Sequence, residues 1–285
     1  MVDVLIIGAG GAGQCAALEA KNKGVSVAVY SQSEPTRAQT CMAQSGMNSA
    51  LGGEHSIDLH VNDTLRSSQG LAREGVVRYV MEEAPRAVSW LDTLGMPFSR
   101  TKEGKIAQRK MGAASEPRTC YSQDYTGLKL LHTLYDTCLK KEIHFVSGRL
   151  LLELLVSHNT CYGALFLNIK NGEVEVVEAK QVILASGGYG GLYHGETTNG
   201  NEATGDGIAA ALRVGAKLSD LEYVQFHPTS LAHSSILFSE SARGAGGLIV
   251  NDLGERFVNE NMTRDEVSRG LALQLRQGRK IFLDI

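Results

Sequence analysis

Three glycines near the amino terminus have the spacing of a dinucleotide-binding turn. Gly8, Gly10 and Gly13 form G-x-G-x-x-G, with Gly11 between them, directly after an apolar, β-branched run at residues 2–7. The first glycine of such a turn lets the chain reverse, the second lets the backbone approach a pyrophosphate, and the third lets a helix pack closely on the strand. The amino end of that helix stabilises the phosphate charge. The segment predicts a bound dinucleotide in preference to a purely structural turn.

The acid that commonly holds the ribose of NAD is missing from the second predicted strand. That strand covers residues 25–30, and the nearest carboxylate beyond it is Glu34. NAD-binding folds usually place an Asp or Glu at the end of this strand. Its absence argues against NAD and leaves FAD as a candidate.

A second pair of glycine turns lies further along the chain. Residues 185–188 (ASGG) follow an apolar strand and predict either a second backbone approach to the same cofactor or an ordinary tight turn. Residues 204–207 (TGDG) open a short helix. Thr204 or Asp206 there is either an N-cap or part of the cofactor site.

The charged motifs in the last quarter of the chain have structural interpretations of their own. Glu240 and Arg243 are three residues apart, which suits a salt bridge along a helix. Arg264 precedes an aspartate, as at the start of a helix, and His227 lies in a Gln-Phe-His-Pro turn. From spacing alone, these structural roles are the better interpretation.

The elements that position these residues follow from the periodicity. Residues 2–30 read as strand, glycine turn, helix and strand, a unit that predicts a parallel, right-handed connection. Helices are expected at residues 56–70, 74–94 with a break or kink near Pro85, 127–141 and 204–214, and strands at residues 143–147, 150–157, 161–169, 174–178, 181–185 and 280–285. The expected fold class is α/β.

Composition excludes several classes of protein. The formal charge is −3, so there is no basic excess to bind nucleic acid. No apolar run approaches the roughly 18–20 residues of a membrane helix. The five cysteines and eight histidines show no metal-ligand spacing, so no metal site is expected.

Seven short motifs, in order along nearly the whole chain, resemble one enzyme family. They are residues 35–40 (PTRAQT), 96–100 (MPFSR), 126–127 (TG) with 131–135 (LHTLY), 197–199 (TTN), 225–229 (QFHPT), 239–244 (SESARG) and 263–265 (TRD). The chain thereby resembles the flavoprotein subunit of succinate dehydrogenase and fumarate reductase. L-aspartate oxidase shares most of these motifs, although residues 105–134 resemble the first group better.

The resemblance implies a Rossmann-like FAD-binding domain with an inserted β-meander and an α+β capping domain. We expect residues 1–218 to belong to the FAD-binding domain and residues 219–285 to begin the capping domain. Members are roughly twice as long, so the sequence is expected to be incomplete at its carboxyl end, within the capping domain.

The resemblance also implies roles for individual residues. Arg264 matches the arginine that exchanges a proton with the substrate carbon, and Glu240 and Arg243 match the relay that supplies it. The predicted substrate-binding residues are His227, Thr229, Ser239 and Phe98. The predicted cofactor-binding residues are Gly8, Gly10, Gly11, Gly13, Ser31, Gln39, Thr40, Gln44, Ser45, Gly46, Ala185, Ser186, Gly187 and Asp206.

Gln39 departs from the family pattern. Many members carry a histidine there that bonds covalently to FAD, and glutamine cannot form that bond. The sequence therefore predicts non-covalent FAD, which disfavours succinate oxidation, favours fumarate reduction and brings the chain closer to aspartate oxidase. Ala242 and Ala245 also replace a cysteine and a glutamate that the family often has beside Arg243.

The resemblance implies an FAD-dependent oxidoreductase acting on the CH–CH group of a C4 dicarboxylate, fumarate or succinate, in the tricarboxylic acid cycle or in anaerobic respiration. An iron–sulfur subunit and membrane-anchor subunits are the expected partners. The expected location is the cytoplasm or, through those partners, the cytoplasmic face of the inner membrane. Two alternatives stay open: L-aspartate oxidase, and a non-catalytic fragment that binds a nucleotide or a partner protein.

Overall fold

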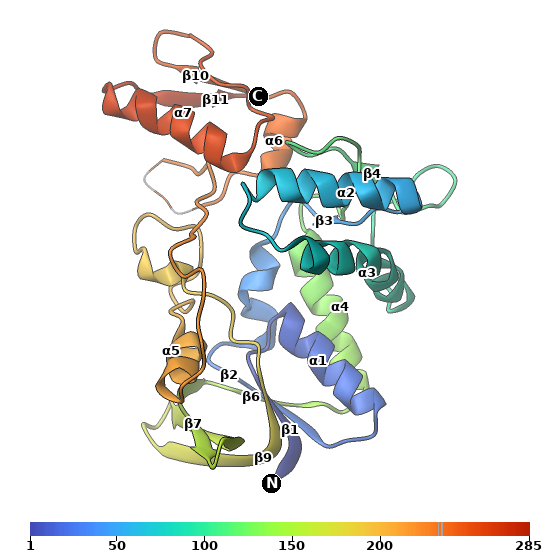
Figure 1. Ribbon diagram of the computed structural model, residues 1–285, viewed down its shortest axis with the longest axis vertical. Coiled ribbons are helices and arrows are strands. Elements are labelled where there is room, and N and C mark those ends of the chain that lie inside the picture. Colours follow the sequence, from blue (N-terminus) through green and yellow to red (C-terminus); the bar gives the residue numbers. More distant parts are fainter. Residues whose placement is uncertain (233, 235) are drawn as a thin grey trace. The chain divides into compact units, whose positions relative to one another are not determined.

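The computed structural model describes residues 1–232, 234 and 236–285 (Figure 1). The chain divides into two compact units. Unit 1 contains residues 1–43 and 127–224, and unit 2 contains residues 44–126 and 225–285. This division follows chain contacts, and the domain boundary expected after residue 218 stays a prediction.

Unit 1 is built on a six-stranded sheet of order β6-β2-β1-β9-β8-β7. Its strands are β1 (Val2–Ile7), β2 (Val27–Ser31), β6 (His144–Ser147), β7 (Arg149–Ser157), β8 (Thr160–Asn168) and β9 (Val174–Leu184). β1 pairs in parallel with both β2 and β9, and β2 pairs in parallel with β6. The expected parallel unit and α/β class are therefore confirmed.

One strand replaces the two that were expected at residues 174–178 and 181–185. β9 runs unbroken through this segment. Its first part, to Glu178, pairs antiparallel with β8, and its second part, from Ala179, pairs in parallel with β1. The prediction of two strands was wrong because Ala179 and Lys180, which separate them in the sequence, lie within the strand. β9 thereby joins the antiparallel β-meander to the parallel nucleotide-binding strands.

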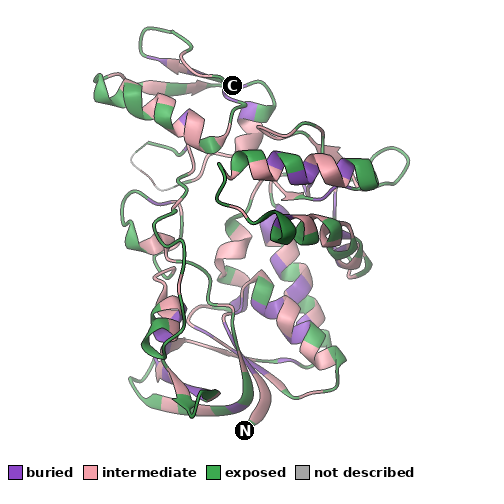
Figure 2. Cartoon of the chain, in the orientation of Figure 1, coloured by how far each residue is buried: buried purple, intermediate pink, exposed green. Residues whose placement is uncertain are grey.

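Helices α1 (Gly11–Asn22), α4 (Thr126–Lys140) and α5 (Asp206–Arg213) belong with this sheet, as do the short 3-10 turns η1 (Pro35–Arg37), η2 (Gln39–Met42) and η3 (Gly190–Leu192). Figure 2 shows buried residues on both α1 and α4. Gln14 of α1 is fully buried, and its Nε2 donates to Ala9 O at 2.8 Å. That bond ties the start of α1 to the glycine turn.

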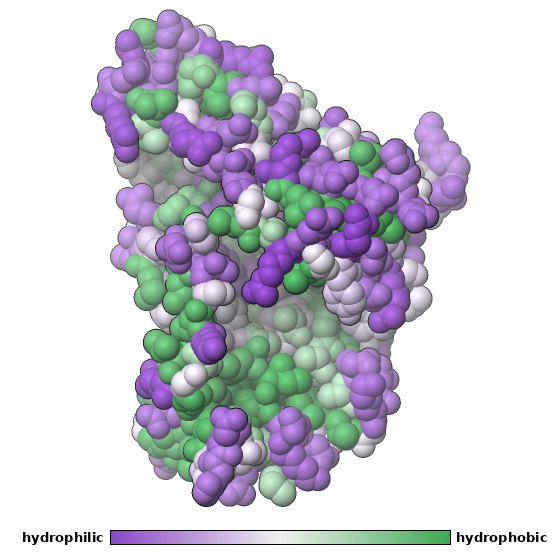
Figure 3. Space-filling model, in the orientation of Figure 1, coloured by the Kyte–Doolittle hydropathy of each residue, from purple (hydrophilic) through white to green (hydrophobic). Residues whose placement is uncertain are grey.

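One apolar cluster of unit 1 lies between the sheet and α5. It consists of Leu5, Ile7, Leu151, Ala164, Phe166, Ala179 and Ala210. Hydrophobic residues also reach the surface low in the view of Figure 3. Val174 and Val176 of β9 are more than half exposed. The apolar cluster therefore does not include the exposed start of β9.

Unit 2 combines helices with two small sheets. Its elements are α2 (Glu54–Ser67), α3 (Glu74–Thr93), α6 (Glu240–Gly244), α7 (Arg264–Arg276), the antiparallel trio β3 (Met47–Asn48), β5 (Thr119–Cys120) and β4 (Gln108–Arg109), and the antiparallel pair β10 (Leu248–Asn251) and β11 (Ile281–Asp284). α3 continues through Pro85 as a single helix, so the break is absent and the kink stays a prediction. No helix among the described residues is long and apolar enough to cross a membrane.

A buried ion pair anchors α2 in unit 2. Arg118 is 1% exposed, and its Nη1 lies 2.8 Å from Asp63 Oδ2. Asp63 also accepts hydrogen bonds from the backbone and hydroxyl of Ser115. Because a buried carboxylate is stable only when it is paired and hydrogen-bonded, this cluster fixes the loop before β5 to the helix.

Candidate functional site

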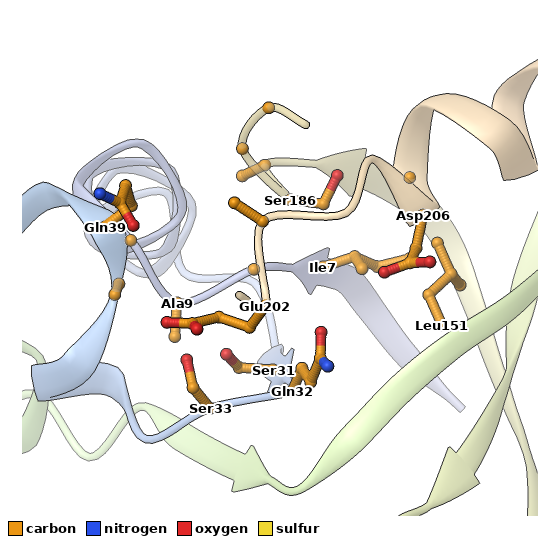
Figure 4. Close-up of a pocket in the computed structure, with 18 of the residues that line it drawn as sticks. Ile7, Ala9, Ser31, Gln32, Ser33, Gln39, Leu151, Ser186, Glu202 and Asp206 are labelled. Carbon is orange, nitrogen blue, oxygen red and sulfur yellow. The ribbon is translucent and has the colours of Figure 1, made fainter. Parts of the chain in front are cut away.

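A cavity of about 350 Å³ opens in unit 1 where β1, β2 and β9 end (Figure 4). Loops after the carboxyl ends of parallel strands are where such sheets bind nucleotides. Of the predicted cofactor residues, those that line it are Gly8, Gly10, Gly11, Ser31, Gln39, Thr40, Ala185, Ser186, Gly187 and Asp206. The structure thus brings ten residues from five separate segments of the sequence to one cavity.

The glycines of the first turn are required by close packing. A Cβ on Gly8 would lie 2.2 Å from Ala185 O, and the backbone there has φ +111°. A Cβ on Gly13 would lie 1.9 Å from Gly8 O. Gly13 does not line the cavity, and its role is to let α1 pack against the turn, as the spacing predicts.

The amino end of α1 is available to an anion. Gly10, the N-cap residue, has no side chain to cap the helix. The Gly11 N–H donates to Thr40 Oγ1 at 3.0 Å, which holds the 3-10 segment against this end of the helix. A helix end with uncapped N–H groups carries partial positive charge and suits a phosphate.

Gln39 faces the cavity and is fixed by the backbone. Its Oε1 accepts a hydrogen bond of 2.9 Å from Gly200 N. The residue that replaces the family's histidine is therefore oriented by the loop that precedes α5.

Two carboxylates reach the cavity. Asp206 begins α5 and accepts a hydrogen bond of 2.6 Å from Thr204 Oγ1. Glu202 was not predicted; in Figure 4 its carboxylate extends toward Ala9 and Ser33. Among the described residues Glu202 has neither a hydrogen-bond nor an ion-pair partner. The sequence offered one signal for it: because the usual acid at the end of β2 is missing, an acid from another segment could take its place.

A second cluster, in unit 2, is centred on Glu240. Arg264 donates to Glu240 Oε2 from Nε at 3.0 Å and from Nη2 at 2.8 Å, and its Nη1 donates to Gln225 Oε1 at 3.1 Å. Arg264 is the first residue of α7, whose start is fixed by a capping box between Thr263 and Glu266. The capping box holds the backbone of Arg264, so the position from which its side chain extends is fixed.

Arg243 is buried and lies near Glu240. Its Nη1 donates to Glu260 O at 2.8 Å, and its Nη2 is 3.9 Å from Glu240 Oε2. Burial lowers the pKa of Arg243, and the opposing effect of Glu240 does not cancel it. The salt bridge expected from spacing alone is thus long, and Glu240 makes its shorter contacts to Arg264.

His227 and Thr229 occupy the same cluster. His227 Nδ1 is 2.9 Å from Thr229 O and 3.2 Å from Thr229 N, and Nε2 has no partner among the described residues. Burial lowers the pKa of His227, and the charges of Arg264 and Arg243 act in the same direction. The lowered pKa favours the neutral imidazole, which can present an N–H or a lone pair.

The remaining predicted residues of unit 2 are Ser239, Gln44, Ser45, Gly46 and Phe98. Ser239 is the N-cap of α6, and Ser45 Oγ lies 3.2 Å from its hydroxyl. Gln44 Nε2 donates to Leu237 O at 3.5 Å, and a Cβ on Gly46 would lie 2.5 Å from Cys120 O. Gln44, Ser45 and Gly46 are not among the residues that line the cavity of unit 1. Phe98 is 4% exposed, in the core of unit 2.

Comparisons with known proteins identify the family. The FAD binding domain family matches residues 3–284. The chain belongs to that family. The two glycine turns and the cavity that they both line fit FAD. Among the described residues no group of three His, Cys, Asp or Glu could hold a metal ion.

Named relatives extend the comparison. The chain is 38% identical to the succinate dehydrogenase flavoprotein subunit of Rickettsia bellii, covering 98% of this chain and 50% of the relative. It is 40% identical to the 8-methylmenaquinol:fumarate reductase flavoprotein subunit of Wolinella succinogenes, with 97% and 47% coverage. Among solved structures, a variant of E. coli quinol fumarate reductase FrdA matches with TM-score 0.94 and 32% identity, over 100% of this chain and 53% of that one.

The resemblance deduced from seven motifs is therefore confirmed, together with the expected FAD-binding α/β fold. The chain spans about half the length of the curated relatives that it matches.

Proposed function

We propose that this chain carries the flavin-dependent step of a fumarate reductase or succinate dehydrogenase, the interconversion of fumarate and succinate. The observation that carries the proposal is the double contact of Arg264 with Glu240. An arginine is a poor acid in water, and a neighbouring carboxylate in a partly desolvated cluster is the setting in which it can pass a proton. FAD, when bound, supplies the hydride that the reduction of fumarate requires.

In this proposal Arg264 delivers a proton to one carbon of fumarate and removes one from succinate. Glu240 returns the proton to Arg264 through the 2.8 Å contact at Nη2. Arg243, buried and 3.9 Å from the same carboxylate oxygen, continues the relay away from the substrate.

The substrate-facing residues in this proposal are His227, Thr229, Ser239 and Phe98. A dianion needs hydrogen-bond donors and positive charge around both carboxylates. His227 Nε2 is available for one carboxylate, and Arg264 supplies positive charge. Phe98 supplies an apolar wall.

We infer that FAD binds without a covalent bond, because Gln39 provides no nucleophile. We also propose an iron–sulfur subunit as electron partner and membrane-anchor subunits beyond it, because the named relatives are flavoprotein subunits of succinate dehydrogenases and a quinol-linked fumarate reductase. The proposed location is the cytoplasm, or the cytoplasmic face of the inner membrane through those partners.

L-aspartate oxidase is the second candidate function, and Gln39 is the observation that favours it, because that enzyme also binds FAD non-covalently. The two candidates differ in which ligand exchanges electrons with the flavin. The test is anaerobic stopped-flow absorbance at 450 nm of the FAD-loaded protein. We expect the dithionite-reduced protein to be reoxidised by fumarate and the oxidised protein to stay oxidised with aspartate. Reduction by aspartate would favour the second candidate, and no response to either ligand would contradict both.

A further inference from the structure

Four polar side chains of unit 2 form a hydrogen-bonded row that ends in an ion pair. Ser45 Oγ lies 3.2 Å from Ser239 Oγ, which lies 2.5 Å from Ser241 Oγ. Ser241 Oγ is 2.9 Å from both carboxylate oxygens of Asp124. Arg109 closes the row with Nη2 2.9 Å from Asp124 Oδ1. Ser239, a member of this row, directly precedes Glu240 in the sequence.

Arg109 is held in place independently of Asp124. Its Nε donates to Ser45 O at 3.1 Å, its Nη2 donates to Ser45 O at 2.5 Å and to Gln123 O at 3.1 Å, and its guanidinium lies 4.4 Å from the centre of the Tyr121 ring. The cation that pairs with Asp124 is therefore fixed by backbone oxygens and an aromatic face.

The direction of the hydrogen bonds in this row is determined by its charged end. A carboxylate paired with an arginine has no hydrogen to donate, so Ser241 must donate its only hydroxyl hydrogen to Asp124. Ser241 Oγ then accepts from Ser239, because one hydrogen must lie between oxygens 2.5 Å apart. Ser239 in turn accepts from Ser45 Oγ and from the backbone N–H of Ser241 at 3.3 Å.

The hydroxyl of Ser239 is therefore fully used inside the protein. Its hydrogen goes to Ser241, and its two lone pairs receive Ser45 Oγ–H and Ser241 N–H. A hydroxyl has one hydrogen and two lone pairs, so nothing remains for a ligand. A substrate carboxylate, which only accepts hydrogen bonds, would meet an oxygen at Ser239 and not a donor.

Ser239 lies where it would meet that carboxylate. A short antiparallel pairing, in which Phe238 N donates to Thr229 O at 3.1 Å and Thr229 Oγ1 donates to Phe238 O at 3.1 Å, brings the His227 segment beside it. Glu240 follows Ser239 directly.

We propose that Ser241 and Asp124 set the affinity of this site for dicarboxylates, by keeping the Ser239 hydroxyl hydrogen directed away from the substrate. Both are positioning residues in this account. The inference rests on the proposed function, because it assumes that a dicarboxylate binds beside Ser239. In this proposal Ser241 is the residue that weakens carboxylate binding.

The test is substitution of Ser241 followed by a binding measurement. In Ser241→Ala the Ser239 hydrogen is released and can be donated to the ligand carboxylate, so we expect binding to tighten about fivefold. Malonate, a dicarboxylate with no double bond to reduce, is titrated into the FAD-loaded full chain, and the change in the flavin absorption band gives the Kd. Ser241→Gly removes the same hydroxyl and keeps the test available if the alanine variant does not fold.

Controls separate this effect from a loss of structure. With Ser239→Ala alone as the reference, the Ser239→Ala, Ser241→Ala double variant should show no gain in malonate affinity. Ser67→Ala, on the exposed end of α2, should have no effect. Weaker or unchanged malonate binding in both Ser241 variants would overturn the inference while leaving the proposed function intact. A wild-type protein that binds FAD but no malonate would overturn the proposed function, and the inference with it.

Discussion

Arg264 donates two hydrogen bonds to a single oxygen of Glu240, from Nε at 3.0 Å and from Nη2 at 2.8 Å. Arg264 begins one helix and Glu240 begins another, so the contact joins α7 to α6. Glu240 is 12% exposed and Arg264 is 43% exposed. The guanidinium thus lies between a shielded carboxylate and solvent, the arrangement that a proton relay ending at a substrate requires.

Arg264→Lys should lower kcat for fumarate reduction by about 10² or more and change KM much less. Lysine keeps the charge but cannot contact Glu240 from two nitrogens at once, so proton delivery is lost while attraction for the dianion is kept. Arg269→Lys on the same helix, in an exposed pair with Asp265, is the matched control and should retain activity. Equal losses in the two variants, measured by fumarate-dependent dye oxidation, would contradict the role of Arg264.

Gly13→Ala should destabilise the protein by about 3 kcal/mol and abolish FAD binding. Its Cβ would lie 1.9 Å from Gly8 O, a backbone atom that cannot move aside as the end of a flexible side chain could. Gly75→Ala in α3 is the matched control, because a Cβ there meets nothing within 4 Å. A helix prefers alanine to glycine by up to about 1 kcal/mol, so this control should be neutral or more stable. Urea unfolding measures both; a stable Gly13→Ala protein that binds FAD would refute the packing argument.

Glu202→Gln should weaken FAD binding about tenfold. The Glu202 carboxylate lies in the cavity without a partner, near the end of β2 where a ribose hydroxyl is normally held. We therefore expect it to accept a hydrogen bond from a hydroxyl of the cofactor. Glu196→Gln, which changes an exposed residue outside the cavity lining, is the control in the same fluorescence titration. Tighter FAD binding in Glu202→Gln would mean that the carboxylate repels the pyrophosphate instead.

Stability should fall as the pH drops from about 6.5 to about 4, in part because of His60. Burial lowers the pKa of His60 to about 4, with the charge of Arg118 acting in the same direction and Asp63 and Glu116 opposing it. The folded state keeps His60 neutral, whereas the unfolded chain takes up a proton below pH 6.5, so acid favours unfolding. The full loss attributable to this group is about 3 kcal/mol.

His60→Leu should flatten this part of the pH profile of urea midpoints. Asp63, whose pKa is lowered by its hydrogen bonds to Ser115 and Arg118 despite its burial, loses stabilising contacts only at lower pH, so the two effects separate. His227 also has a lowered pKa and remains in the variant, so a residual slope is expected. An unchanged profile would show that His60 does not titrate in this range.

The nucleotide site was largely predictable from the sequence, because its chemistry depends on local spacing. The glycines at 8, 10 and 13 fix a turn after a strand, and the backbone clashes at Gly8 and Gly13 explain why no other residue serves. The parallel pairing of β1 with β2 followed from the short connection between them.

What the sequence did not reveal depends on contacts between distant segments. The change of partner within β9 is a property of the sheet, and polar residues at its centre resemble a turn when only the sequence is considered. Glu202 reaches the cavity from a segment without regular periodicity. Asp124 and Arg109 lie more than 100 residues before Ser241, and only the fold brings them to the start of α6.

The most direct test of the central claim is the visible absorption spectrum of the purified protein after incubation with FAD and removal of unbound ligand, followed by acid precipitation. A dinucleotide cavity with Gln39 beside it predicts a flavin band near 450 nm that moves entirely into the supernatant. A flavin band that stays with the precipitated protein would contradict non-covalent binding. A protein with no flavin band would contradict the assignment of the cavity in unit 1 to FAD.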